Sequence, residues 1–237
     1  KETNYDWWRK RVSRQLTQLN LLRLDHFRAL VSYWAVPGDE KTAQEGKWEP
    51  SPGDKLLNLL RKDFNNKLPL IAEDLGVINK DVEDLRDKFN LPGMKILQFA
   101  FNGDENNPYL PKNITTSSWV VYSGTHDNPT TLGWWKELDK SIKKEIMKIN
   151  HSDFDNPSWD LIDIGMSTKA FLFIAPLQDI LGLDNHARFN KPGSIGDNNW
   201  SWKLEEFDSY VTSHLNTYGE RSLYWGRSFA SAKYFLE

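Results

Sequence analysis

The feature of this sequence that most constrains its fold is a series of five short apolar runs, separated by residues with helical periodicity. None of the runs alternates strictly between apolar and polar residues, which is typical of strands buried on both faces of a parallel sheet. The runs cover residues 21–25, 68–73, 95–101, 119–122 and 171–176. Short strands that alternate with helices predict an α/β protein with a parallel sheet.

Helical patterns precede, separate and follow these runs. Trp8, Val12 and Leu16 recur at every fourth position and predict a first helix, and the same face continues at Leu19. Further helices are predicted over residues 56–64, 82–89, 132–149, 159–166, 204–215 and about 223–235.

Three stretches rich in Gly, Pro, Asn and Asp predict long irregular loops after strands. They cover residues 37–53, 103–118 and 183–202. In a parallel barrel the loops that follow strands lie on one face, where such folds place their functional residues. The sequence shows no internal repeat and no linker, so we expect one domain over residues 1–237.

Three acids stand at strand ends: Asp25, Glu73 and Asp127. Glu73 follows Asp25 by 48 residues and Asp127 follows Glu73 by 54, which leaves room for a helix and a return strand in each interval. The carboxyl ends of parallel barrel strands all face one way, so we expect the three acids to converge. Converging carboxylates are the catalytic groups of glycosidases.

Each acid also has a simpler interpretation. Arg23 and Asp25 are two apart on a strand and face the same way, so the guanidinium favours the ionised carboxylate that a nucleophile needs; an isolated pair of this kind is also a common structural ion pair. Glu73 closes an apolar run, and burial near a second carboxylate favours the protonated form that a proton donor needs. Glu73 and Asp74 equally suit the N-terminal cap of a helix.

The third acid lies in the tripeptide His126-Asp127-Asn128, which supplies three hydrogen-bonding side chains after a strand. Such groups can hold sugar hydroxyls around an oxocarbenium-like transition state. The alternative is a turn capped by an Asx side chain.

The composition of the chain argues against several classes of partner and cofactor. The net charge of −3 gives no electrostatic footprint for nucleic acid, and no apolar run exceeds seven residues, so we expect no membrane span. Without cysteine there are no disulfides, which fits a cytoplasmic location. The five histidines form no metal-binding pair, so we expect neither metal nor cofactor. Eleven tryptophans suit either sugar faces or a core.

Taken together, the motifs resemble the 4-alpha-glucanotransferases, also called amylomaltases or disproportionating enzymes, a glycoside hydrolase family. The resemblance covers nearly the whole chain, in order. It rests on RLDHFR (23–28), YWxxP with the following TA, GxW and PG (33–53), IAEDLG (71–76), PGMKILQFAF (92–101), NPYLPKN (107–113), GTHDN (124–128) and APLQDILGL, ARFNKPG and NWSW (175–202).

The resemblance implies a (β/α)8 TIM-type barrel. Family members are about twice as long, and their first barrel strands precede the segment that matches here. Residues 1–237 would then be the C-terminal portion of a single catalytic barrel domain, with about its last five βα units. The missing N-terminal half, or a second copy, is the expected protein partner.

The resemblance also implies the chemistry. Asp25 would be the nucleophile, Glu73 the general acid/base and Asp127 the transition-state stabiliser of a retaining double displacement. The reaction would transfer α-1,4-glucan segments, including maltooligosaccharides, to the 4-hydroxyl of an acceptor sugar. The implied substrate contacts are Arg23, His126, Asp74 and Asn128, with Tyr33, Trp34 and Trp48 lining the glucan groove. Two alternatives stay open: an α-glucan hydrolase with the same acids, and a catalytically inactive fragment.

Overall fold

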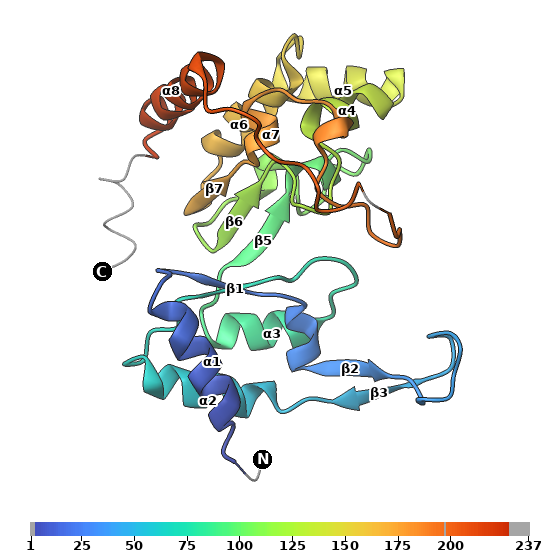
Figure 1. The fold of residues 1–237 in the computed structure, drawn as a ribbon, viewed down its shortest axis with the longest axis vertical. Helices are drawn as coiled ribbons and strands as arrows, with labels where there is room; N and C mark the ends of the chain where they lie inside the picture. The colour runs from blue at the N-terminus through green and yellow to red at the C-terminus, as the bar shows by residue number, and fades with distance from the viewer. Residues whose placement is uncertain (1–2, 197, 228–237) are drawn as a thin grey trace. The chain divides into compact units, whose positions relative to one another are not determined.

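The computed structural model describes residues 3–196 and 198–227, which fold as an α/β protein (Figure 1). The residues group into two compact units, Lys1–Met94 and Lys95–Glu237. Within the described ranges, no helix combines the length and the apolar character that a membrane crossing requires.

The first unit is built on a pair of parallel strands with helices packed beside them (Figure 1). Residues Leu22, Arg23 and Leu24 of β1 lie opposite Leu70, Ile71 and Ala72 of β4. The elements are α1 (Asp6–Leu16), β1 (Leu22–Leu24), a 3-10 turn (Phe27–Leu30), β2 (Ser32–Ala35), β3 (Lys47–Pro50), α2 (Gly53–Asp63), β4 (Leu70–Ala72) and α3 (Lys80–Lys88).

The core of the first unit joins the apolar faces of its helices to β4. Val12 of α1, Leu57 of α2 and Val82 of α3 are each at most 2% exposed and belong to one cluster. α3 begins at Asn79, whose side chain accepts a hydrogen bond from the Val82 N–H, as an N-cap does. β4 is buried along its whole length, whereas β1 is only half-buried.

The second unit carries a three-stranded sheet in the order β5-β6-β7, with β6 and β7 parallel. β5 spans the boundary between the two units. The elements are β5 (Gly93–Ile96), 3-10 turns (Leu97–Phe99, Pro111–Asn113 and Asn185–Ala187), β6 (Trp119–Tyr122), α4 (Thr131–Glu137), α5 (Lys140–Asn150), α6 (Pro157–Ser167), β7 (Leu172–Ile174), α7 (Leu177–Ile180) and α8 (Ser209–Tyr224).

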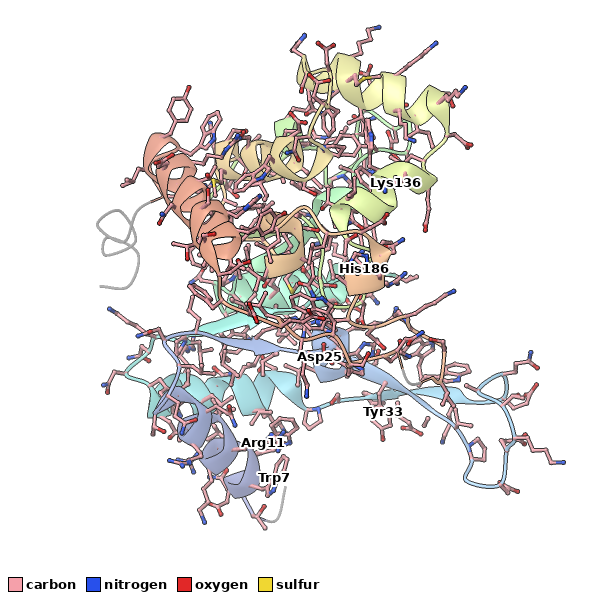
Figure 2. The ribbon with its side chains drawn as sticks, turned by 45° about the horizontal axis from the view of Figure 1, so that its top comes forward. Trp7, Arg11, Asp25, Tyr33, Lys136 and His186 are labelled. Atoms are coloured by element: carbon pink, nitrogen blue, oxygen red, sulfur yellow. The ribbon has the colours of Figure 1, made fainter. Side chains whose placement is uncertain are left out.

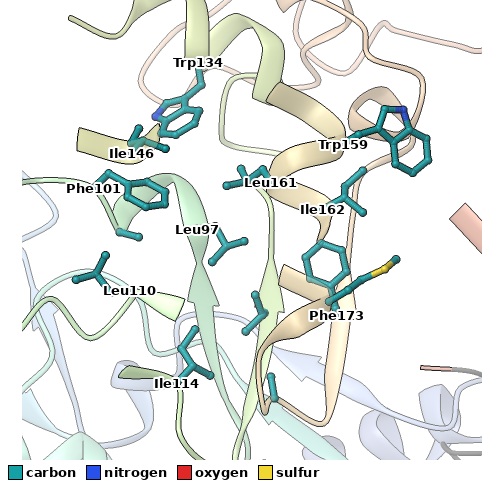
Figure 3. Packing of buried hydrophobic residues seen from close by; sticks show 14 of the residues in the cluster. Leu97, Phe101, Leu110, Ile114, Trp134, Ile146, Trp159, Leu161, Ile162 and Phe173 are labelled. Carbon is teal, nitrogen blue, oxygen red and sulfur yellow. The ribbon is translucent and has the colours of Figure 1, made fainter. Parts of the chain in front are cut away.

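The core of the second unit lies between the sheet and α6 (Figure 3). Leu161 and Ile162 of α6 are fully buried and pack with Leu97 and Phe173. Gly165 lets the helix approach closely, because a Cβ at this position would lie 2.1 Å from the Phe173 ring.

The five predicted strands are all present, and the parallel pairing is confirmed for β1 with β4 and for β6 with β7. The third run is shorter than expected. It is a strand only over Gly93–Ile96, because the chain then turns into a 3-10 helix over Leu97–Phe99.

Three other expectations were wrong. Residues 37–53 are not all irregular: Lys47–Pro50 pairs antiparallel with Ser32–Ala35, and a helix begins at Gly53. The helix predicted over 132–149 is two helices, because Leu138 has extended backbone angles and Asp139 starts a new helix. The helix predicted over 204–215 begins only at Ser209, after Asp208, whose side chain caps it, and runs to Tyr224. Residues 228–235 of the last predicted helix lie outside the described residues.

Candidate active site

The register of β1 and β4 places Asp25 and Glu73 at the carboxyl ends of neighbouring parallel strands. The last paired residues are Leu24 and Ala72, and the two acids follow them directly. The ladder continues past the acids, because the Glu73 N–H donates to the Leu24 carbonyl at 3.0 Å. Neighbouring strands lie about 4.8 Å apart, so the two carboxylates emerge side by side.

Asp25 projects from the end of β1 and forms an ion pair with Arg23 (Figure 2). The Arg23 Nη1 lies 2.8 Å from the Asp25 Oδ1, and the Arg23 Nε contacts the Met94 sulfur at 3.3 Å. The Asp25 side chain is 77% exposed, whereas that of Arg23 is 30% exposed. The expected pairing along the strand is confirmed, and it leaves the carboxylate accessible to a ligand.

The Glu73 carboxylate is held by two backbone N–H groups. His26 donates to the Glu73 Oε2 at 2.6 Å, and Leu75 donates to the Glu73 Oε1 at 3.1 Å. His26 directly follows Asp25 and has left-handed backbone angles (φ 49°), which are uncommon for a residue other than glycine. One strained residue therefore connects the two acids, and no sequence signal indicated it.

Asp74 lies next to Glu73 but is buried, with 7% of the residue exposed. Its Oδ2 contacts the Arg86 Nη1 at 2.5 Å, and its Oδ1 accepts the Met94 N–H at 2.8 Å. Burial alone would lower the pKa of Arg86, but hydrogen bonds to Asp74 and Asp87 outweigh it and raise that pKa above its ordinary value. This geometry gives Asp74 a structural role, and its contact with a sugar stays a prediction.

Asp127 lies in the second unit, in the loop between β6 and α4. Its Oδ1 accepts a hydrogen bond from the Asn190 Nδ2 at 2.6 Å, and its backbone carbonyl accepts one from the Arg188 Nη2 at 2.7 Å. The side chain is 47% exposed. Neither Arg188 nor Asn190 was singled out from the sequence, where they are visible only inside the motif ARFNKPG.

The two neighbours of Asp127 in the tripeptide, His126 and Asn128, differ in their contacts. The His126 Nε2 lies 3.3 Å from the Asp127 Oδ2, and the His126 ring lies 5.3 Å from the exposed Trp200 ring. The Asn128 Oδ1 instead accepts hydrogen bonds from the Thr125 N–H and hydroxyl, at 2.9 and 2.8 Å. The Asx-capped turn is therefore present at Asn128, while its contact with substrate stays a prediction.

The hairpin of β2 and β3 presents an aromatic surface in the first unit (Figure 2). Trp34 and Trp48 are cross-strand partners whose rings are 5.4 Å apart, and with Tyr33 they are between 38% and 50% exposed. The Arg28 guanidinium lies 4.2 Å from the Trp48 ring. Exposed aromatic rings of this kind suit contact with sugar rings. In residues 3–196 and 198–227, no three His, Asp or Glu side chains gather to hold a metal ion.

The sequence matches known proteins along most of its length. A family model described as 4-alpha-glucanotransferase matches residues 1–209. The 4-alpha-glucanotransferase of Synechocystis sp. is 44% identical over 230 residues, which cover 93% of this chain and 45% of that protein. The enzyme of the same name from Thermus thermophilus is 42% identical over 207 residues, 84% of this chain and 41% of that protein. The chain thus spans less than half the length of these curated relatives.

Solved structures give the same result. The amylomaltase of Streptococcus agalactiae, in complex with acarbose, matches with a TM-score of 0.88 and 29% identity over 96% of this chain and 46% of its own. The amylomaltase of Corynebacterium glutamicum shares the fold, with a TM-score of 0.69 and 18% identity over 93% of this chain and 38% of its own. These neighbours support a TIM-barrel-type fold. Since the family model covers most of its residues, the chain belongs to the 4-alpha-glucanotransferase family.

Proposed function

We propose that residues 1–237 carry the catalytic acids of a 4-alpha-glucanotransferase, which moves α-1,4-glucan segments to the 4-hydroxyl of an acceptor sugar. Asp25 acts as the nucleophile, Glu73 as the general acid and base, and Asp127 as the stabiliser of the transition state. Arg23 and His126 contact the donor sugar. Maltooligosaccharides and longer α-1,4-glucans are the substrates, and the acarbose complex of the S. agalactiae amylomaltase supports this class.

The observation that carries the proposal is the side-by-side position of Asp25 and Glu73 at the ends of β1 and β4. Retaining glycosidases hold their two carboxyl groups about 5–5.5 Å apart, whereas inverting enzymes hold them about 6.5–9.5 Å apart. Neighbouring parallel strands, about 4.8 Å apart, suit the shorter separation. The geometry of the first unit therefore favours a double displacement with retention.

The steps follow from the two carboxyl groups. Asp25, which lies beside Arg23, attacks the anomeric carbon while Glu73 protonates the leaving glycosidic oxygen. A glycosyl ester on Asp25 results. Glu73 then takes the proton from the 4-hydroxyl of an acceptor, which displaces Asp25 and restores the α-configuration. None of these steps requires a cofactor, and a cytoplasmic location stays a prediction.

The same proposal includes the rest of the barrel. Among the described residues, β1 and β7 are each less buried than β4, β5 and β6. We assign these five parallel-type strands to the last five units of an eight-stranded barrel. Strands from an N-terminal half, or from a second copy, would then cover the open edges.

Product analysis on maltotriose tests the function in the enzyme that contains this chain at full length. Transfer yields a ladder of shorter and longer oligosaccharides, with newly formed bonds in the α-configuration by NMR. Glucose and maltose as the only products would show the hydrolase alternative instead. If residues 1–237 are purified alone, size-exclusion chromatography and the same assay should show an inactive or self-associating chain. A stable, active monomer would contradict the partial-barrel assignment.

A further inference from the structure

Asp179 on α7 is a buried acid that the proposed reaction does not use. Only 1% of the residue is exposed, and burial raises the pKa of its carboxyl group. A carboxylate that is taken out of water must be satisfied by hydrogen bonds, or it destabilises the fold. The position of its hydrogen-bond donors therefore indicates what Asp179 does.

In the part of the chain that the structure describes, the donors to this carboxylate come from two residues of one neighbouring segment. The Ser123 hydroxyl donates to the Asp179 Oδ2 at 2.6 Å. The Thr131 N–H donates to the Oδ1 at 2.7 Å, and the Thr131 hydroxyl donates to the Oδ2 at 2.8 Å. Both Ser123 and Thr131 are completely buried. One carboxylate thus joins two points of the chain that are eight residues apart.

The segment between these two points carries Asp127. Ser123 is the first residue after β6, Thr131 is the first residue of α4, and Asp127 lies four residues from each. Asp179 therefore fixes both ends of the loop at whose centre the candidate transition-state stabiliser stands. We define residues 123–131 as the Asp127 loop.

The interior of the Asp127 loop is also packed closely. Its turn is capped by Asn128, and the Gln98 Nε2 donates to the Pro129 carbonyl at 3.1 Å. The cavity between the loop and α7, lined by Thr125 and Asp179 among others, has a volume of only about 10 Å³. We expect a change at either end to shift the loop between them, because both ends are completely buried.

We propose that Asp179 is a positioning residue, which fixes both ends of the Asp127 loop and so places the Asp127 carboxylate for the transition state. The inference rests on the proposed function of Asp127. A misplacement of about 1 Å in a catalytic group costs on the order of 100-fold in rate. Asp179 needs no contact with substrate to have such an effect.

The test removes the donors at the loop ends and keeps Asp127 itself. Ser123→Ala and Thr131→Val each delete one hydroxyl with little change in shape, and they are made singly so that at least one folded variant is available. Ser158→Ala is the matched control. Ser158 is likewise a buried serine, 1% exposed, but its hydroxyl has no hydrogen-bond partner in the described part of the chain.

The kinetic measurement compares two backgrounds in the full-length enzyme. In the wild type, Ser123→Ala and Thr131→Val should lower kcat about 10- to 100-fold and leave KM within about twofold, while Ser158→Ala changes neither. In an Asp127→Asn background, the same two substitutions should lower kcat by less than about twofold, since the group that they position is already lost. Equal losses in both backgrounds would overturn the proposal.

A second measurement is independent of activity. Hydrogen–deuterium exchange of the amides between residues 124 and 130 should accelerate at least about tenfold in the two loop-end variants and not in Ser158→Ala. Unchanged exchange would overturn the positioning role even in an active enzyme. Faster exchange in an enzyme that fails to act on maltotriose would support the loop restraint and refute the proposed function of Asp127.

Discussion

Each unit of the chain contains a buried aspartate close to a candidate catalytic acid. The two buried aspartates differ in their hydrogen-bond partners. Asp74, next to Glu73, faces the guanidinium of Arg86. Asp179, which joins the ends of the Asp127 loop, accepts its hydrogen bonds from neutral hydroxyl and amide groups. Among the described residues, the first acid is half of an ion pair, and the second has only neutral donors.

A buried aspartate can therefore act in two different ways. An ion pair couples the fold to both partners, so loss of either one leaves a buried charge. A carboxylate with neutral donors holds those donors in a fixed geometry. Its burial costs stability, and the size of this cost depends on whether the carboxyl group is protonated. The exposed Asp25 and the half-buried Glu73 belong to neither type, and substitutions there should change the chemistry more than the fold.

The largest expected effect is on activity when the exposed Asp25 is replaced. Asp25→Asn should lower transfer from maltotriose by about a thousandfold or more, because the attacking group is lost. The melting temperature should stay near that of the wild type, since the side chain is 77% exposed. Asp39→Asn, at another exposed position of the same unit, is the control. Retention of more than a few per cent of the activity in Asp25→Asn would refute the nucleophile assignment.

Glu73→Gln should have a smaller effect that depends on the donor. With maltotriose the rate should fall about 100- to 10,000-fold, because the leaving sugar needs a proton. With α-glucosyl fluoride, whose leaving group needs none, the first step should be much less affected. Steady-state and single-turnover rates on both donors provide the measurement. Equal losses on both would show that Glu73 is not the acid.

The contrast between buried and exposed partners of one arginine can be measured directly. Asp74→Asn should lower the free energy of unfolding by about 3–5 kcal/mol, since it leaves Arg86 buried without its main counter-charge. Asp87 also pairs with the Arg86 guanidinium, but the Asp87 side chain is 64% exposed. Asp87→Asn should therefore lower the free energy of unfolding by only about 0–1 kcal/mol. Urea unfolding of both variants tests this. Similar losses would mean that burial does not decide the strength of these pairs.

The smallest expected effect is the pH dependence due to Asp179. Burial raises its pKa above the ordinary value of 3.8, so the folded chain binds more protons than the unfolded chain just above that pH. The free energy of unfolding should therefore fall as the pH rises from 3.8 through the raised pKa. Relative to Asp179→Asn, the wild type should lose stability over this range. A difference between the two proteins that does not vary with pH would contradict the buried charge.

The sequence predicts the strand positions well because burial on two faces leaves compact apolar runs. It does not predict the β2 and β3 hairpin, where aromatic pairing between Trp34 and Trp48 closes a long loop rich in Gly and Pro. The sequence also predicts one helix where the structure has two, α4 and α5. Leu138 continues the apolar spacing of α5, but its own backbone is extended and separates the two helices. In the hairpin, contacts between residues distant in sequence override the local pattern.

The candidate site is predictable only in part. An acid at the end of an apolar run identifies Asp25 and Glu73, but Asp74 and Asp179 meet the same criterion and are buried. Sequence position alone does not distinguish an acid that faces solvent from one that faces a core. The left-handed backbone of His26, which directs its N–H to Glu73, likewise has no sequence signal.

If Asp25 and Glu73 act in turn on one covalent intermediate, that intermediate can be trapped. Full-length enzyme with Glu73→Gln is mixed with α-glucosyl fluoride, which loads the nucleophile without acid assistance, while the missing base slows release. Intact mass spectrometry followed by peptide mapping measures the product. We expect one added glucosyl unit, as an ester on Asp25. No adduct under conditions where fluoride is released, or an adduct on another residue, would contradict it.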